Sequence, residues 1–323
     1  MKLYGNKYFT GTVQSMLKSG RLAHCFIIFG EKGVGKKTAA GYLAKALVCT
    51  GEEERPCGRC RACRLAEENA HPDIIFPETA GKLNTYNIET VREVRSGAYV
   101  KPNDGNAKAY IFRDADNIKL PAQNALLKII EEPPEFAYFI FTASSKSAFL
   151  PTILSRAVSL GIAPCSIDQC SAALGERGYS SEQILAAQSC FGGNIGMCIS
   201  FLENDNLQNI ASLTKKAVNS IINKDEYSFL AALSSPEIKD RETVRLFLEM
   251  LDKAIRDAAV MRVNPDAEAA GCCKGESLRL APLITASGAE RMHSLIYRAS
   301  LDAEANVSTF LLMSALCGGI MNS

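Results

Sequence analysis

The sequence has little of several things that proteins use to make contacts or to catalyse reactions. It contains no tryptophan, only three histidines, and almost no charge imbalance, with 36 Lys and Arg against 35 Asp and Glu. A net charge of +1 gives no general attraction to nucleic acid or anionic membrane, so such contacts would need local patches. An isolated histidine is far more often a surface or core residue than a ligand, so none is assigned to a metal or to catalysis.

Long apolar runs are also missing. The longest apolar stretch, residues 309–321, is shorter than the roughly 20 residues that a helix needs to cross a bilayer. The first residues lack the apolar segment of a signal peptide, so we predict a cytoplasmic protein without a membrane partner. In that reducing compartment the twelve cysteines do not indicate a disulfide framework, and closely spaced cysteines indicate metal or redox chemistry.

The first half of the chain has the pattern of an α/β domain. An apolar fraction of 47% and a length of 323 residues suit two or three globular domains at about 150 residues each. Short runs rich in Ile and Phe alternate with helical patterns, which predicts a parallel sheet flanked by helices. These runs are 25–29, 74–76, 109–112 and 138–142.

The second half has a helical pattern. Residues 166–206 predict two or three short helices with a turn at Gly192-Gly193, and residues 241–262 carry an apolar stripe with a period of 3.6. Further helices fit 283–302 and 304–317. We therefore predict three domains: an α/β domain over 1–163, a small helical domain over 164–207 and an all-helical domain over 208–323.

A glycine-rich loop follows the first predicted strand and precedes a helix, which is the setting of a phosphate-binding P-loop. The glycines allow backbone N–H groups to surround phosphate oxygens, and Lys36 would reach the β- and γ-phosphates. The candidate nucleotide-binding residues are Gly30, Gly33, Gly35, Lys36, Lys37 and Thr38.

This loop departs from the usual motif at one position. The residue after the lysine is normally Ser or Thr, whose hydroxyl binds Mg²⁺, but here it is Lys37. Thr38 lies one residue further along, about 100° around the helix, and is a poor substitute. The sequence therefore predicts a degenerate P-loop, for which ATP and Mg²⁺ are doubtful ligands.

Four cysteines, Cys49, Cys57, Cys60 and Cys63, lie within fifteen residues directly after the P-loop helix. Four thiolates at this spacing suit a closed tetrahedral zinc site, which leaves no ligand position for water and is therefore structural. An iron–sulfur run would place its next cysteine at position 67, which is Glu67. Unrelated reduced thiols are the alternative to zinc.

Together with the P-loop and the cysteines, two later segments resemble bacterial clamp-loader subunits of DNA polymerase III, which are AAA+ proteins. These segments are 124–134, a helix that ends in two glutamates and two prolines, and 150–156, which ends in Ser155-Arg156. The likeness covers residues 1 to about 200, and the last third matches only in being helical. It implies an AAA+ P-loop domain with a zinc module at 49–63, a helical lid at 164–207 and an oligomerisation collar at 208–323.

Within this family the sequence resembles the delta-prime branch more than the ATP-hydrolysing gamma/tau branch. The family's magnesium-binding aspartate aligns with Arg113, and Asp114 occupies the following glutamate position. The segment 192–196 resembles sensor 2, but its arginine is replaced by Gly196. With Lys37, these departures affect one reaction, so ATP hydrolysis by this chain itself is not expected.

The resemblance implies a role for Arg156, because the family's Ser-Arg pair faces the nucleotide of the neighbouring subunit and supplies an arginine finger. The chain would then be a stator in a hetero-pentamer with gamma/tau and delta subunits, loading the sliding clamp onto primed DNA during replication. A capping salt bridge is the plainer alternative for Arg156. Five basic residues of 80–110 could also contact the DNA backbone, or form a solvated helix face: Lys82, Arg92, Arg95, Lys101 and Lys108.

Two other functions remain open. The chain could be a gamma/tau-type ATPase that uses Thr38 and Asp114 as substitute magnesium ligands, or a zinc-dependent nucleic-acid-binding module with a vestigial P-loop. Magnesium-dependent turnover by the isolated chain would favour the first. Salt-dependent DNA binding without a partner would favour the second, although the neutral net charge argues against it.

Overall fold

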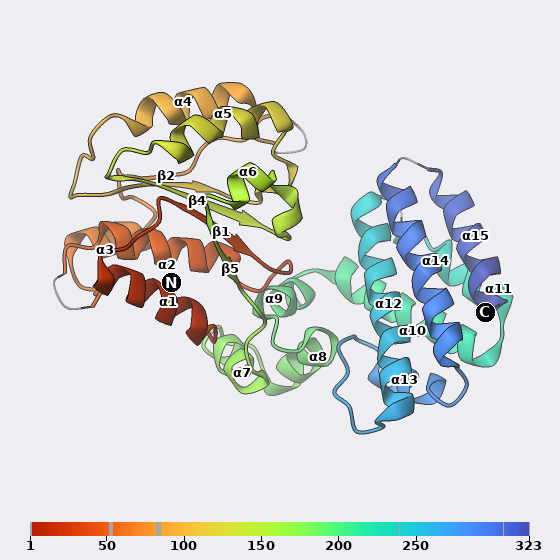
Figure 1. The fold of residues 1–323 in the computed structure, drawn as a ribbon. Coiled ribbons are helices and arrows are strands. Elements are labelled where there is room, and N and C mark those ends of the chain that lie inside the picture. The colour runs from red at the N-terminus through yellow and green to blue at the C-terminus, as the bar shows by residue number, and fades with distance from the viewer. Residues whose placement is uncertain (1, 52–53, 82–84, 239, 306, 323) are drawn as a thin grey trace. The chain divides into compact units, whose positions relative to one another are not determined.

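The computed structural model describes residues 2–51, 54–81, 85–238, 240–305 and 307–322. The chain forms two compact units, Met1–Cys165 and Ser166–Ser323. The first unit is a layered α/β structure and the second is helical, as the sequence predicts (Figure 1).

The first unit is built on a five-stranded parallel sheet with the strand order β2-β3-β4-β1-β5. Four strands coincide with the predicted apolar runs, and the edge strand β5 was not predicted. Its sequence is Val-Ser-Leu-Gly, and only Leu160 is buried, so it lacks the continuous apolar run of a central strand. The strands are β1 (Cys25–Phe29), β2 (Ile74–Ile75), β3 (Lys108–Phe112), β4 (Ala137–Ala143) and β5 (Val158–Gly161).

Helices cover both faces of this sheet because side chains alternate along each strand. Phe26 and Ile28 of β1 pack with α1 and α2, whereas Ile27 packs with α4 and α5 on the opposite face. Figure 1 shows α1 and α2 on one side of the sheet and α4 and α5 on the other. The helices of this unit are α1 (Lys7–Ser19), α2 (Lys36–Val48), α3 (Arg61–Glu67), α4 (Ile88–Ala98), α5 (Leu120–Glu131) and α6 (Pro151–Leu154), with short 3₁₀ turns η1 (Ala115–Asn117) and η2 (Lys146–Ala148).

The second unit is helical throughout its described residues. The predicted stripe of residues 241–262 is confirmed, because Val244, Phe247, Leu251 and Ile255 of α12 are buried in one core. The helices are α7 (Ile167–Gly175), α8 (Ser181–Phe191), α9 (Ile195–Glu203), α10 (Asp205–Asn223), α11 (Glu226–Leu233), α12 (Arg241–Val263), α13 (Lys274–Leu280), α14 (Ala286–Glu304) and α15 (Thr309–Met321).

The predicted three-domain division coincides with the observed one only at the junction near residue 165. Phe191, Met197 and Phe201, from α8 and α9, pack against the same core as α10 to α15. A separate lid at 164–207 therefore stays a prediction. Among the described residues no single helix is long and apolar enough to cross a membrane; α8 and α9 would pass together by length and composition, but they meet at a bend of 118°.

Candidate functional site

The P-loop connects β1 to α2 and is held closely against the end of the sheet. Gly30 has a φ of 155°, and a side-chain Cβ there would lie 2.2 Å from the carbonyl oxygen of Ile162, just after β5. Gly35, with a φ of 100°, precedes the first residue of α2. Both positions require glycine, so the predicted loop geometry is present.

The P-loop lysine is directed back into its own loop. Lys36 Nζ donates hydrogen bonds to the carbonyl oxygens of Gly30 at 2.6 Å and Glu31 at 2.7 Å. Its side chain is buried, and this burial lowers the pKa of the Lys36 ammonium. The Lys36 ammonium therefore already has two carbonyl oxygens as hydrogen-bond acceptors. A phosphate would have to replace these acceptors or bind beside them.

Lys37, at one of the two positions expected to bind Mg²⁺, forms an ion pair with Asp114, the residue after the other position. Lys37 Nζ lies 2.7 Å from Asp114 Oδ2, and both side chains are more than half exposed. Asp114 follows β3, and its backbone N–H donates to Thr142 Oγ1 on β4 at 2.9 Å. The sheet thus positions the carboxylate opposite the P-loop helix, where it binds an ammonium group.

Arg113, which replaces the magnesium-binding aspartate, lies against an aromatic ring. Its guanidinium carbon is 3.9 Å from the centre of the Phe76 ring, which is a cation–π contact. Its carbonyl oxygen accepts a hydrogen bond from the Tyr86 hydroxyl at 2.9 Å. Thr38, the substitute ligand considered above, is a half-buried residue of α2.

The four predicted metal ligands come together. The sulfur atoms of Cys49, Cys57, Cys60 and Cys63 all lie within 4.8 Å of one another, and two pairs are 3.9 and 4.0 Å apart. Tetrahedral zinc with Zn–S bonds of about 2.3 Å requires sulfur–sulfur separations of about 3.8 Å. The cluster can therefore hold a metal ion, and its dimensions fit zinc.

Backbone N–H groups point at these sulfur atoms. Cys49 Sγ accepts from the N–H groups of Gly51 and Cys57, and Cys60 Sγ accepts from Cys63 N–H at 3.3 Å. Burial alone would raise the pKa of Cys60, but hydrogen bonds from the backbone of Cys63 and Thr50 lower it to about 5. Such bonds favour the thiolate, the form that binds metals.

The cysteine module is attached to the helices beneath it. Gln14 Nε2 on α1 donates to the Arg55 carbonyl oxygen and to the Tyr42 hydroxyl, and Lys45 on α2 pairs with Glu67 on α3. The segment that carries the four cysteines therefore also contacts α1 and the P-loop helix α2.

Arg156 follows α6 and makes contacts within its own unit. Its Nη2 lies 3.1 Å from Glu131 Oε1 at the end of α5, and its Nη1 donates to the Thr152 carbonyl oxygen and to Ser155 Oγ. An open hollow of about 520 Å³ adjoins it, lined by Ala23, His24, Ile130, Glu131, Glu132, Pro133 and Arg156. The Arg156 side chain is about two-fifths exposed, so it is accessible to another molecule.

The sequence did not indicate that Glu131 and Lys37 would have these partners. Each pair joins residues far apart in the chain, Glu131 with Arg156 and Lys37 with Asp114. Two adjacent glutamates at the end of a helix were the available signal for the first pair, because carboxylates are unfavourable at a helix C-terminus without a compensating cation.

One expectation about basic residues is wrong. Lys108 lies within β3, is buried, and donates from Nζ to the carbonyl oxygens of Gly97 and Val100, so it is neither on a solvated face nor available to DNA. Arg92, Arg95 and Lys101 are not buried, and Lys82 lies outside the described residues.

The sensor-2-like segment belongs to the second unit. Gly192 ends α8, and Asn194 caps α9 by accepting a hydrogen bond from the N–H of Met197. Gly196 lies in the first turn of α9, so the position where a hydrolysing subunit would carry arginine has no side chain.

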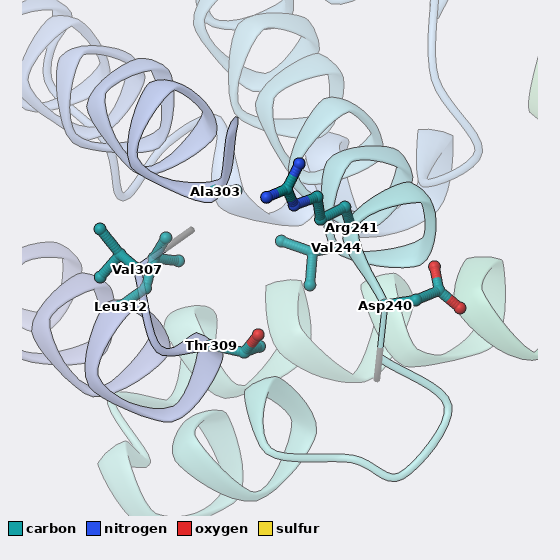
Figure 2. Close-up of a pocket in the computed structure, with 7 residues that line it drawn as sticks. All are labelled: Asp240, Arg241, Val244, Ala303, Val307, Thr309 and Leu312. Carbon is teal, nitrogen blue, oxygen red and sulfur yellow. The ribbon is translucent and has the colours of Figure 1, made fainter. Parts of the chain in front are cut away.

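A second hollow, of about 330 Å³, lies among α12, α14 and α15 (Figure 2). The Asp240 carboxylate caps α12, where it accepts a hydrogen bond from the N–H of Thr243. The Arg241 side chain extends toward Ala303 in Figure 2. None of the residues lining this hollow belongs to the predicted sites, which all lie elsewhere.

Comparison with known proteins finds a family match that covers almost the whole first unit. Residues 5–166 match the family model described as DNA polymerase III, delta subunit. The delta' subunit of DNA polymerase III from Escherichia coli is 31% identical over 226 residues, which cover 69% of this chain and 68% of that protein.

The gamma/tau branch is similar as well. The gamma/tau subunit from Mycobacterium tuberculosis is 33% identical over 156 residues, covering 48% of this chain but only 27% of that longer protein. A solved gamma-subunit-related protein from Thermotoga maritima covers 96% of this chain and 98% of its own, with a TM-score of 0.48 and 13% identity. On the strength of the family model and of the match to E. coli delta', this chain belongs to the DNA polymerase III clamp-loader family that includes delta' and gamma/tau.

Proposed function

We propose that this chain is the delta-prime subunit of a bacterial DNA polymerase III clamp loader, a stator that does not hydrolyse ATP. The observation that carries the proposal is the Lys37–Asp114 ion pair, which places an ammonium group where the reaction would need Mg²⁺. Arg113 adds a second cation in place of a magnesium ligand. The P-loop geometry is retained, but the groups that would bind the metal are not.

In this proposal the chain acts on a neighbour's nucleotide through Arg156. A guanidinium presents paired N–H donors that suit phosphate oxygens, and it stabilises the charge that develops on a phosphoryl group during transfer. The partners would be gamma/tau and delta subunits in a hetero-pentamer, which opens the sliding clamp and places it on primed DNA. The chain would thus serve DNA replication as a part of the DNA-directed DNA polymerase.

We propose zinc as the metal of the four-cysteine cluster, with a structural role. Four thiolates close a tetrahedral site, so no ligand position is left for water or substrate. The sulfur–sulfur distances of 3.9 and 4.0 Å support this choice. When bound, zinc would join the end of α2 to α3 and hold the inserted module together.

Substitution of Arg156 tests the stator role. In the complex reconstituted with gamma/tau, delta, clamp and primed DNA, Arg156→Ala should leave assembly intact and lower ATP turnover at the site it serves by about 10³. Arg156→Lys should keep little of the wild-type ATP turnover, because lysine lacks the planar pair of donors. Arg177→Ala, at an exposed arginine of the second unit, is the matched control. An unchanged ATPase rate in Arg156→Ala would refute the role.

A gamma/tau-type ATPase is the competing proposal, supported by the 33% identity to that branch. It requires Asp114 to leave Lys37 and bind Mg²⁺ together with Thr38. Magnesium-dependent ATP hydrolysis by the isolated chain, abolished by Lys36→Ala, would favour it over the stator.

A further inference from the structure

Arg156 has a carboxylate partner within its own chain. Its guanidinium pairs with Glu131 through Nη2, at 3.1 Å, while Nη1 is held by the carbonyl oxygen of Thr152 and by Ser155 Oγ. We propose that Glu131 keeps Arg156 in a resting position, and that the nucleotide phosphate of the neighbouring subunit displaces Glu131 when that subunit is loaded. This inference rests on the proposed function of Arg156.

The position of Glu131 is unfavourable for a carboxylate without a partner. Glu131 is the last residue of α5, and Glu132 caps the same end. The C-terminus of a helix carries partial negative charge, so acidic side chains there are destabilising unless a cation offsets them. Arg156 supplies that cation, and in return one of its nitrogen atoms is occupied.

The contacts of the two terminal guanidinium nitrogens have different origins. Thr152 and Ser155 belong to the same short segment as Arg156, so they hold Nη1 whether or not α5 contributes. Glu131 belongs to another helix and holds only Nη2. Its removal would therefore release Nη2 and leave Nη1 held by Thr152 and Ser155.

The strength of the pair suits an exchangeable contact. Both side chains are about two-fifths exposed, with side-chain exposures of 41% for Arg156 and 44% for Glu131. An ion pair at such a position stabilises by at most about 1 kcal/mol after screening by solvent, equivalent to about fivefold in an equilibrium. A phosphate with two acceptor oxygens binds a guanidinium more strongly. Phosphate can therefore displace Glu131. In the resting state, the ion pair with Glu131 reduces the fraction of free Arg156 only modestly.

Glu132 provides a matched control. It lines the same hollow, carries the same charge and is adjacent in sequence. Among the residues that the structure describes, the ion pair of Arg156 is made with Glu131. Glu131→Gln and Glu132→Gln therefore make the same change of charge in the same hollow, and they differ in whether Arg156 loses its partner.

In the reconstituted complex, Glu131→Gln should lower the KM for ATP by up to about fivefold, and raise the rate at subsaturating ATP accordingly, because more of Arg156 is free to meet phosphate. The DNA-stimulated kcat should stay the same, since the loaded state has already lost the Glu131 contact. Glu132→Gln should behave as the wild type. A fall in kcat, or a KM equal to that of Glu132→Gln, would overturn the inference.

A measurement on the isolated full-length chain does not depend on the complex. Arginine side-chain NMR should show faster rotation of the Arg156 guanidinium in Glu131→Gln, with Glu131→Asp intermediate and Glu132→Gln unchanged. Unchanged rotation in Glu131→Gln would show that the pair does not hold the side chain. Loss of ATPase in Arg156→Ala, combined with that result, would leave the finger standing and reject the resting contact. No loss in Arg156→Ala would reject the finger itself.

Discussion

The first unit contains two regions whose sequences suggest a bound cation, and they differ in what they have kept. The cysteine cluster has all four candidate ligands within 4.8 Å of one another. The P-loop has kept its glycines and Lys36 but has Lys37 and Arg113 where a magnesium site needs oxygen atoms. One region can hold a metal ion, and in the other the sequence predicts that protein cations replace the ion's ligands.

The difference indicates which property each region supplies. A closed thiolate site contributes to folding, since its ligands come from two helices and the loop between them. A magnesium site at a P-loop contributes chemistry, and the fold does not require one here, because the Asp114 carboxylate is paired with Lys37. This contrast supports the proposal that the chain serves as a rigid platform and does not hydrolyse ATP itself.

The largest expected effect is on the cysteine cluster. Cys60→Ser should lower the free energy of unfolding by at least about 3 kcal/mol, because it removes a metal ligand and with it the folding energy that metal binding supplies. Metal analysis of the purified wild type should find about one zinc per chain. Cys165→Ser, at a half-buried cysteine outside the cluster, should be nearly neutral. If the wild type contains no metal and Cys60→Ser is equally stable, the cysteine cluster is not a metal site and does not differ from the P-loop in this respect.

The next effect concerns the P-loop. Calorimetry of ATP binding to the isolated wild type should show no dependence on Mg²⁺. The double substitution Lys37→Thr with Arg113→Asp restores a hydroxyl and a carboxylate at the metal positions, so Mg²⁺ should strengthen ATP binding by about tenfold or more.

The matched control for this experiment is Lys37→Thr alone, which restores one ligand and should gain less. Tight, magnesium-dependent binding by the wild type would reverse the contrast. It would mean that Asp114 can leave Lys37, and the ATPase proposal would then account better for the chain.

The smallest expected effect is on stability, when the Lys37–Asp114 ion pair is removed. Asp114→Asn removes the charge that faces Lys37, and it should cost no more than about 1 kcal/mol in unfolding free energy, since Lys37 and Asp114 are 55% and 60% exposed. Asparagine is chosen because residue 114 has a φ of 50°, a conformation it tolerates. Asp116→Asn keeps an oxygen for the Ser144 N–H and is the neighbouring control. A loss of several kcal/mol would mean that the pair is structural.

Local patterns were sufficient for most secondary structure. The four apolar runs became β1 to β4, and the stripe of 241–262 became α12, because burial of a continuous run or a periodic face leaves a direct trace in sequence. β5 left no such trace, since it is an edge strand with one buried residue. The burial of Lys108 was missed for a related reason, because its ammonium is satisfied by carbonyl oxygens from residues that only folding brings near.

The sequence by itself determined the cysteine cluster and the P-loop, because in each the functional groups lie within about fifteen residues and their spacing dictates their geometry. With the family resemblance, it also predicts which magnesium ligands are replaced, since that prediction needs only the residue types at the aligned positions. Only the tertiary structure decided the partners of the charged groups. Lys37 meets Asp114 because the carboxyl ends of the parallel strands β1, β4 and β3 lie at one edge of the sheet, and Arg156 meets Glu131 because α5 ends beside α6. Ion pairs between distant residues have no local periodicity, so they appear only when the sheet and its helices are assembled.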